Sequence, residues 1–410
     1  MSDYRKLFSD FMKESRSRGV VDYIVKGSLL VYTILLLTTP ITVGRIPALT
    51  PEQAVFLVLT YAVFVGKGMG FIKDIAPLVI LFFAYEAMRG VVIAGEQRVI
   101  TDYWAVSNYS SGLEVKINPM LVNVGETFVI NVTTSDEVEY VDFVARKNDS
   151  NKEVNFTIKL LEGKGSYVVE RDSELFGETG LYNITARARG YEGINGSAVV
   201  GVTKNVHYKE PIELERSLFG MIPTVYLQEK FYKEGKISAI DWIAIITYIL
   251  HLPLPFFFAS LIWFKDREMY KKYSATFLIL AYTGLLTFLL YPASPPWLSG
   301  LVGYLDGVKK LYHEISQSLN LIILPTLYYW INANEVAAVP SLHAAFPLLI
   351  SIYSFKLWGK RGLVVLLYPV ATAFSLVYLG EHYAVDVLLG FVYVFASIVF
   401  VELLFRWERR

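Results

Sequence analysis

Long apolar stretches dominate this chain and are separated by short polar ones. A helix needs about 20 consecutive apolar residues to cross the hydrocarbon core of a bilayer. The sequence contains eight stretches of this kind, near residues 22–43, 52–70, 74–95, 239–264, 273–292, 341–357, 362–380 and 384–405. We therefore predict a polytopic all-α membrane protein with about eight spans.

The segment between the third and the fourth stretch has a different pattern. Over residues 100–212 apolar and polar residues alternate, as in "TFVINVTT" (127–134) and "LYNITARARG" (181–190). Alternation with a period of two, bounded by Gly, Asn and Asp turns, is typical of an antiparallel β-sandwich. We predict an inserted all-β sandwich domain, Ig- or fibronectin-like, that is exposed to water.

These two patterns divide the chain into three regions. Residues 1–99 hold three predicted spans, residues 100–212 the β domain, and residues 213–410 five further spans. The third region opens with "RSLFGMIPTVYLQEKFYKEG" (216–235), which has apolar and charged faces but too many breaks to span. We expect an interfacial helix there, outside the membrane and above the site described below.

The composition excludes several classes of protein. Of the 410 residues 54% are hydrophobic and 19% charged, and the mean hydropathy of +0.42 is too high for a soluble protein of this size. The formal net charge is zero, which gives no indication of a nucleic-acid partner. The absence of cysteine excludes disulfides, thiolate metal sites and cysteine nucleophiles.

Basic residues predict the orientation of the spans, because Lys and Arg collect on the cytoplasmic side. The basic segments 67–74, 264–272, 356–362 and 406–410 all fall on the same side as the N-terminus. The N-terminal segment has no small-residue cleavage site, so we expect the first span to be retained. Both termini are then cytoplasmic, and the β domain of this multi-pass cell-membrane protein lies outside.

The sequons for N-glycosylation agree with an external β domain. All six Asn-x-Ser/Thr sequons fall in this domain, at Asn108, Asn131, Asn148, Asn155, Asn183 and Asn195. We predict glycosylation. The alternative is that Asn and Thr simply suit its turns and strands.

Three polar motifs at span ends share this outer face: "YPASPPW" (291–297), "VPSLH" (339–343) and "GEHYAVD" (380–386). In the last, His382 and Asp386 are four residues apart, a spacing that places both on one helical face. The carboxylate would fix the imidazole tautomer and make its other nitrogen more basic. A purely structural hydrogen bond is the alternative, although ionisable groups at membrane depth are usually functional.

The second motif has the features of a phosphate-binding helix start. Pro340 suits the first turn, Ser341 can cap the helix or donate its hydroxyl, and amides at a helix N-terminus attract anions. His343 falls in the same place. Two histidines, one of them paired with a carboxylate, can attack a phosphorus ester and protonate the departing alkoxide. An ordinary capped helix start with a hydrogen-bonded His is the alternative.

These motifs resemble the type 2 phosphatidic acid phosphatase superfamily, and more closely its inositolphosphotransferase-like branch, the relatives of fungal inositol phosphorylceramide synthase. "PSLH" is similar to the superfamily's PSGH, "HYAVD" matches its closing HxxxD, and "YPASPPW" resembles its first outer-loop motif. The similarity also reaches "AYEAMRG" (84–90), "LFGMIPTVYLQ" (218–228) and "YILHLPLPF" (248–256). The β domain lies outside it and looks like an insertion.

The resemblance implies a lipid phosphotransferase or phosphatase with a helical core like that of the superfamily and an extracytoplasmic site. His382 would be the nucleophile that forms a phosphohistidine, Asp386 would orient it, and His343 would be the general acid. Ser341 would bind phosphate oxygens. The resemblance implies neither a cofactor nor a metal.

The chain departs from the superfamily in its positive charges. "YPASPPW" lacks the Lys and Arg of the first motif, and Leu376 stands where an Arg is expected six residues before the nucleophile. A phosphoryl group without cations is poorly stabilised. Arg89, three residues after Glu86, is our leading candidate; a snorkelling Arg or a local pair with Glu86 is the alternative. The weaker candidates are Lys230, Lys309 and Lys310.

Two further residues are candidates for substrate binding. Tyr291 opens the first outer-loop motif. His251, in an apolar segment, would either line the substrate cavity or pack between helices.

The resemblance leaves donor and acceptor open. The donor would be a phosphatidylinositol-like phospholipid or a polyprenyl phosphate, and the acceptor water, a lipid or a polyol; transfer is favoured over hydrolysis. A surface receptor or adhesin anchored by the spans is the alternative, although one span would suffice for it. A transporter is disfavoured because the sequence lacks the inverted repeats expected of one. A vanadate-dependent haloperoxidase shares the same His-centred chemistry but is disfavoured because it would not need the membrane spans. The β domain would bind a glycan or a cell-envelope partner.

Overall fold

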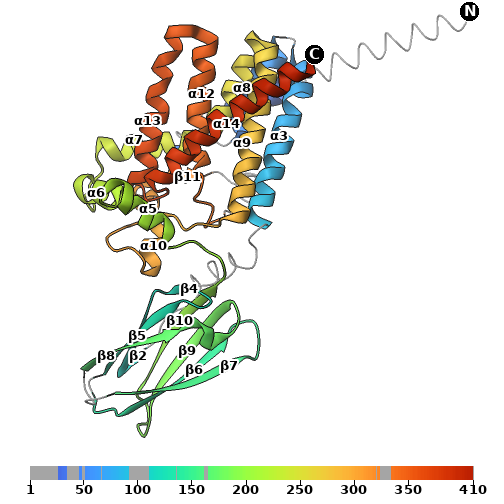
Figure 1. Cartoon of the computed structure of the whole chain (residues 1–410). Helices are drawn as coiled ribbons and strands as arrows, with labels where there is room; N and C mark the ends of the chain where they lie inside the picture. The colour runs from blue at the N-terminus through green and yellow to red at the C-terminus, as the bar shows by residue number, and fades with distance from the viewer. Residues whose placement is uncertain are drawn as a thin grey trace, which may run out of the picture.

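The computed structural model describes residues 26–34, 46–48, 51–65, 67–91, 110–134, 136–160, 165–319, 321–323 and 334–409. These residues form a bundle of helices and a β domain that lies at one end of it (Figure 1). The first predicted span falls largely outside the described residues, and its described part, 26–34, is helical.

Several helices of the bundle are long and apolar. Within the described residues, four stretches could cross a membrane by length and composition: 68–88, 267–290, 342–378 and 384–408. They contain α3 (Gly68–Val91), α9 (Arg267–Leu290), α12 (Leu342–Trp358), α13 (Leu367–Tyr378) and α14 (Ala384–Glu408). The stretch 342–378 is a pair of adjacent helices, α12 and α13, joined by the 3-10 helix η3 (Gly359–Leu366).

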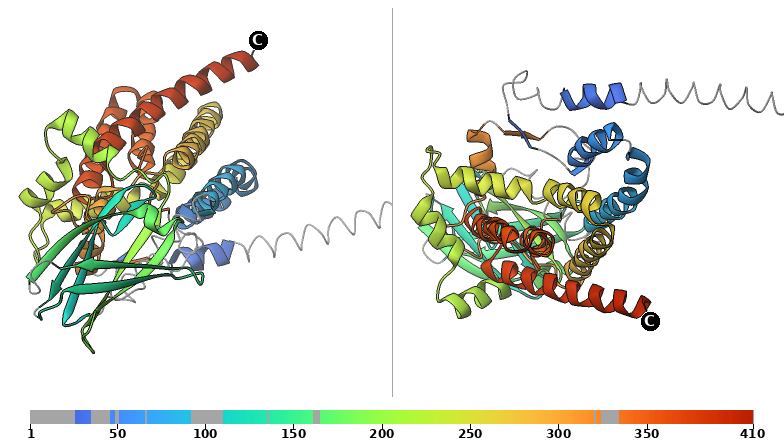
Figure 2. Two further views of the ribbon diagram at one scale, coloured as in Figure 1. Left: turned by 60° about the horizontal axis from the view of Figure 1, so that its bottom comes forward. Right: turned by 90° about the horizontal axis from the view of Figure 1, so that it is seen from above.

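A broken pair of helices adds a possible fifth span. α7 (Ala239–Leu250) and α8 (Pro253–Lys265) meet at 58°, and the proline at the start of α8 has no N–H to continue the α7 ladder. α2 (Pro51–Phe64) is shorter. With α3 it packs beside α8 and α9 at one side of the bundle (Figure 2). The number of spans, about eight, stays a prediction.

The predicted strands are present in the β domain. One sheet has the order β2-β10-β9-β6-β7, with β4 added beside β10, and the other has the order β3-β5-β8. The bounds are β2 Ser110–Ser111, β3 Leu113–Asn118, β4 Leu121–Asn123, β5 Thr127–Thr134, β6 Tyr140–Lys147, β7 Glu153–Lys159, β8 Gly165–Asp172, β9 Gly180–Ala188 and β10 Asn195–Thr203. A 3-10 helix, η1 (Ser173–Phe176), follows β8.

Alternating residues of these strands form a single apolar core. In β5, for example, Phe128, Ile130 and Val132 are fully buried, and residues of both sheets belong to the same cluster. A strand buries every second side chain, so the period-two pattern corresponds to the observed burial. The Ig- or fibronectin-like assignment of the domain stays a prediction.

Short helices connect the β domain to the bundle. α5 (Glu210–Phe219) and α6 (Pro223–Phe231) fall in or beside the segment predicted to be interfacial, and α10 (Pro296–Val302) and α11 (Leu311–Ser318) follow α9. α5 and α10 lie at the end of the bundle that faces the β domain (Figure 1). Two short strands, β1 (Ile46–Ala48) and β11 (Leu321–Ile323), form a separate parallel pair.

Candidate active site

The three outer motifs are joined by backbone hydrogen bonds. The Ala293 N–H donates to the Val336 carbonyl at 2.7 Å, and the Trp297 N–H donates to the Gly380 carbonyl at 2.9 Å. The Ser341 N–H donates to the carbonyl of Asp386 at 3.0 Å. These bonds bring the loop after α9, the start of α12 and the start of α14 together.

A glycine permits the closest of these approaches. A Cβ atom on Gly390 of α14 would lie only 2.4 Å from the Ser341 carbonyl oxygen. Real Cβ atoms do not come so close to a backbone oxygen, so any other residue would push α14 away from the start of α12. Ser341 itself is fully buried. Its Oγ accepts the Ala344 N–H at 3.3 Å and so caps α12.

His382 precedes α14 and is held by two oxygen atoms. Its Nδ1 lies 3.0 Å from the Ala338 carbonyl oxygen and 3.5 Å from Oδ2 of Asp386. That carboxylate oxygen also accepts the Tyr383 N–H at 2.8 Å. The contact is made at the helix start, since α14 begins at Ala384. Because a carbonyl oxygen only accepts, Nδ1 carries the hydrogen and Nε2 keeps its lone pair.

The second histidine, His343, forms a hydrogen bond to this lone pair. His343 Nδ1 lies 3.0 Å from His382 Nε2, so His343 donates and His382 accepts. The ring of His343 lies nearly parallel to that of Tyr248, 5.6 Å away, and 4.2 Å from that of His251. His251 contacts the Tyr248 carbonyl through Nδ1. Its ring thus packs against the ring of His343.

The two histidines line a polar cavity of about 330 Å³. The remaining lining residues come from α7, α10, α11 and the loops before α12 and α14. They are Tyr248, Pro295, Trp297, Lys310, Tyr312, His313, Asn334, Glu335, Ala337, Ala338 and Glu381. Neither Ser341 nor His251, both sequence candidates, is among these lining residues.

The cavity contains a lysine. Nζ of Lys310 lies 3.5 Å from the ring centroid of Trp297, a cation–π contact that fixes the ammonium group at the cavity wall. Lys309 instead pairs with Glu234 at 3.2 Å. Exposed Lys230 donates to the Tyr226 hydroxyl at 2.9 Å.

Arg89, the leading candidate for the phosphate-binding cation, lies in a helix, but the surroundings of its side chain are not described. Arg89 belongs to α3, and its side chain lies outside the described residues. Its part in phosphate binding stays a prediction.

His313, Glu335 and Glu381 are among the polar residues of the cavity that sequence reasoning missed. Burial lowers the pKa of His313 and nearby Lys310 lowers it further, so this imidazole is neutral at pH 7. Burial raises the pKa of the Glu381 carboxyl, although Lys310 and His382 oppose the rise. A signal was available for Glu381, which directly precedes His382 in the sequence.

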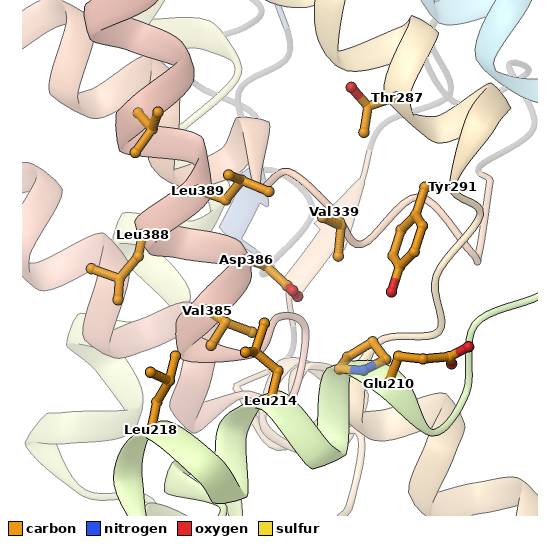
Figure 3. Close-up of a pocket in the computed structure, with 12 residues that line it drawn as sticks. Glu210, Leu214, Leu218, Thr287, Tyr291, Val339, Val385, Asp386, Leu388 and Leu389 are labelled. Atoms are coloured by element: carbon orange, nitrogen blue, oxygen red, sulfur yellow. The ribbon is translucent and has the colours of Figure 1, made fainter.

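Tyr291 lies on the other side of Asp386. Its ring stacks on His207, with centroids 3.7 Å apart, and His207 Nδ1 lies 2.9 Å from Oε1 of Glu210. Tyr291 and Asp386 line a second, mostly apolar cavity of about 480 Å³ between α5, α9 and α14. Figure 3 shows the Asp386 carboxyl pointing from α14 towards the Tyr291 ring.

Comparison with known proteins places this site in a family. The family model of the PAP2 superfamily, the type 2 phosphatidic acid phosphatases, matches residues 212–400. The match covers a little under half of the chain, and over this helical region the chain is similar to the PAP2 superfamily. The match includes His343, His382 and Asp386 and leaves the β domain outside, and the resemblance seen in the motifs is confirmed.

A curated relative points to the same branch. The chain is 31% identical to phosphoinositol dihydroceramide synthase of Bacteroides thetaiotaomicron over 189 residues, which cover 43% of this chain and 61% of the relative. The match thus spans less than two thirds of that protein. A solved polysaccharide lyase structure matches with a TM-score of 0.22 and 11% identity, over 70% of this chain and 38% of its own; a similarity of that size carries no argument. The PAP2 match and the long apolar helices together indicate a multi-pass membrane protein.

Proposed function

We propose that this protein transfers the phosphoinositol group of a membrane phospholipid to the hydroxyl of a second lipid. The observation that supports this most is the pair of imidazoles on the cavity wall, with 3.0 Å between His382 Nε2 and His343 Nδ1. The name of the bacterial relative, a phosphoinositol dihydroceramide synthase, favours this acceptor class over water.

In the first step His382 is the nucleophile. When the bound substrate replaces the hydrogen bond between His343 and His382, the Nε2 lone pair attacks phosphorus, a P–N bond forms, and the P–O bond to diacylglycerol breaks. Protonated His343 gives its proton to the departing oxygen, and a phosphoinositol group remains on His382. The Ala338 carbonyl and the Asp386 carboxylate hold the Nδ1 hydrogen and stabilise the positive charge that the ring gains.

In the second step His343, now neutral, acts as the base. It takes the proton of the acceptor hydroxyl, the oxygen attacks phosphorus, and the P–N bond to His382 breaks. Lys310 supplies the positive charge that the superfamily's first motif normally provides, because its ammonium group lies in the same cavity. Water in place of the lipid would make the same protein a phosphatase.

The membrane side follows from the topology predicted from the basic residues. The cavity is lined by Trp297 of α10, and α10 lies at the end of the bundle that faces the β domain (Figure 1). The sequons favour an extracytoplasmic β domain. We place the chemistry on that side, with donor and acceptor in the outer leaflet. The β domain would then bind glycans or another component of the cell envelope near the site.

The test uses the full chain in lipid nanodiscs with phosphatidylinositol labelled in the inositol ring and a ceramide acceptor. Wild-type protein is expected to move the label to a second lipid. His382→Ala and His343→Ala should each lower the rate at least about 1000-fold. Lys360→Ala, an exposed change in η3, is the control and should match the wild type.

Three results would count against this proposal. Label released as inositol phosphate would identify hydrolysis instead of transfer. Equal rates for wild type and His382→Ala would exclude a phosphohistidine on His382 as the intermediate. Inert wild-type protein with this donor and acceptor would exclude the reaction and leave the anchored receptor as the better explanation.

A further inference from the structure

We propose that the polar cavity holds the polyol ring of the transferred group, with Glu381 as the main acceptor of hydrogen bonds from its hydroxyls. This inference rests on the proposed transfer reaction and names the part of the donor that the site recognises. The residues that carry it are Glu381, Glu335, His313 and Lys310, which line one cavity with the two histidines.

Glu381 is next to the nucleophile in the chain, and both residues line the same cavity. Its Oε1 atom is buried and has no hydrogen-bond partner among the residues that the structure describes. A buried acceptor without a partner is unfavourable. A rotation of the carboxyl that brings this oxygen to the cavity would let a hydroxyl of a bound ligand supply the partner.

The charges of the cavity disfavour a bare phosphate. Among the described lining residues, two carboxyl groups, those of Glu335 and Glu381, accompany one lysine, Lys310, although burial raises the pKa of the Glu381 carboxyl. A phosphate dianion would be repelled by either carboxyl group in its ionised form. A polyol phosphodiester fits better, because its single negative charge can lie beside Lys310 while its hydroxyls donate to the carboxylates.

The cavity also has room beyond the reacting group. A neighbouring cavity of about 530 Å³ shares Trp297, Lys310, His313 and Glu335 with the catalytic one. The space therefore continues past Lys310 in the direction away from the histidines. A ring attached to the phosphorus can extend there while the phosphorus stays near His382.

The second cavity, behind Asp386, offers no comparable site for a polyol. Leucine and valine side chains make up most of its lining, notably Leu214, Leu388 and Val392. It also lies on the side of His382 opposite to Nε2, since Asp386 faces Nδ1. The polyol of the reacting group thus belongs in the first cavity.

The test measures binding separately from turnover. Calorimetry on the full chain in nanodiscs compares the methyl ester of myo-inositol 1-phosphate with dimethyl phosphate. Both are phosphodiesters with one negative charge, and dimethyl phosphate has no hydroxyl. We expect the wild type to bind the inositol compound at least about tenfold more tightly. Glu381→Ala should reduce this ratio to less than about threefold without weakening the binding of dimethyl phosphate. Glu381→Gln keeps an acceptor oxygen and should give an intermediate ratio.

A matched control guards against a general effect of lost charge. Glu153 is exposed in the β domain and pairs with Arg146, so Glu153→Gln should keep the wild-type ratio. Loss of affinity for both phosphates in Glu381→Ala would show a structural role and overturn the polyol site. No preference for inositol phosphate in the wild type would overturn it too.

The two proposals fail in different ways. Selective binding of inositol phosphate without transfer from phosphatidylinositol would reject the proposed reaction and keep the polyol site. Transfer that continues while Glu381→Ala leaves the ratio unchanged would keep the reaction and reject the site.

Discussion

At the scale of single residues, Lys310 is the cation that we propose in place of the Lys and Arg missing from the first motif. The loop that contains "YPASPPW" has no basic side chain, yet its Trp297 forms one face of the contact that holds the Lys310 ammonium group. In the proposed reaction the loop would therefore contribute to phosphate binding indirectly. It supplies the aromatic surface on which the charge is fixed.

We predict that Lys310→Met lowers kcat/KM for transfer about 100-fold, the usual effect of removing one stabilising group from a developing charge. Lys310→Arg should recover part of the loss. The positive charge of Lys310 is one of the two causes that lower the pKa of His313, so the Met variant should also raise this pKa. NMR titration of the five histidines, with His313→Gln for assignment, measures the change.

Lys230→Met is the control for this prediction, because Lys230 is exposed and hydrogen-bonded to Tyr226. It should leave both the rate and the His313 titration unchanged. If Lys310→Met also behaves like the wild type, Arg89 becomes the cation to examine.

The sequence predicted the two histidines and the aspartate because each lies in a short motif with fixed spacing. It ranked Lys310 below Arg89, because no local pattern indicates which charged side chain reaches a cavity. That depends on how the loop between α10 and α11 folds back over the site. Glu335 and His313 were missed for the same reason.

At the scale of secondary structure, the start of α14 depends on a residue far away in the chain. Oε1 of Glu215, on α5, accepts the Val385 N–H at 2.9 Å, although the two residues are 170 positions apart. Glu215 is fully buried. It supplies a hydrogen-bond partner for the helix start that carries Asp386.

This cap is sensitive to pH. Burial raises the pKa of Glu215 from 4.5 to about 7, and the charge of Asp386 adds to the rise, while the bond from Val385 opposes it. Unfolded Glu215 titrates near its ordinary value, so the folded protein binds more protons between pH 4.5 and 7. Its contribution to the free energy of unfolding is therefore fully present below this window and is lost as the pH rises.

We predict that Glu215→Gln is more stable than the wild type at pH 8 and has no such advantage at pH 5. Glutamine keeps an oxygen for the Val385 N–H but does not ionise. The gain at pH 8 is expected to be at most about 3 kcal/mol. Thermal unfolding in nanodiscs at the two pH values measures it, and a constant difference between the variants would contradict the titration of Glu215.

The hydropathy pattern predicted α14 and the strands of the β domain, since both are local periodicities. It did not predict Glu215 as a cap, because only residues 216–219 of α5 fell in the segment expected to be interfacial. Contacts between elements distant in the chain follow from packing, which a single sequence does not display.

At the scale of the whole molecule, the β domain rests on the same short helix that builds the cavity. The Met120 N–H donates to the Val302 carbonyl at 2.8 Å, and Tyr208 stacks on Tyr304 at 4.8 Å. Leu121 of β4 belongs to one buried cluster with residues of α10, Trp297 among them. The insertion thus contacts the catalytic region through a buried interface.

We infer from this interface that the β domain also positions α10, beside its proposed binding of envelope components. α10 has the β domain on one side and the cavity on the other, and its Trp297 holds Lys310. Loosening the docked domain should therefore release Trp297 and the ammonium group with it. The sequence predicted the domain as an insertion but gave no indication of this coupling, because β4 and α10 are separated in the chain by most of the β domain and by five helices, α5 to α9.

We predict that Leu121→Glu, a change within the β domain, lowers transfer about tenfold and speeds hydrogen exchange in α10, because a buried charge at this interface is strongly unfavourable. Val168→Glu is the matched control, since Val168 lies in the same domain and its side chain is 69% exposed. It should change neither quantity. Mass spectrometry of peptides covering 296–302 follows the exchange, alongside the nanodisc transfer assay. Faster exchange in α10 with an unchanged rate would show that the domain docks there without positioning Trp297, and its part in the reaction would then be limited to its own ligands.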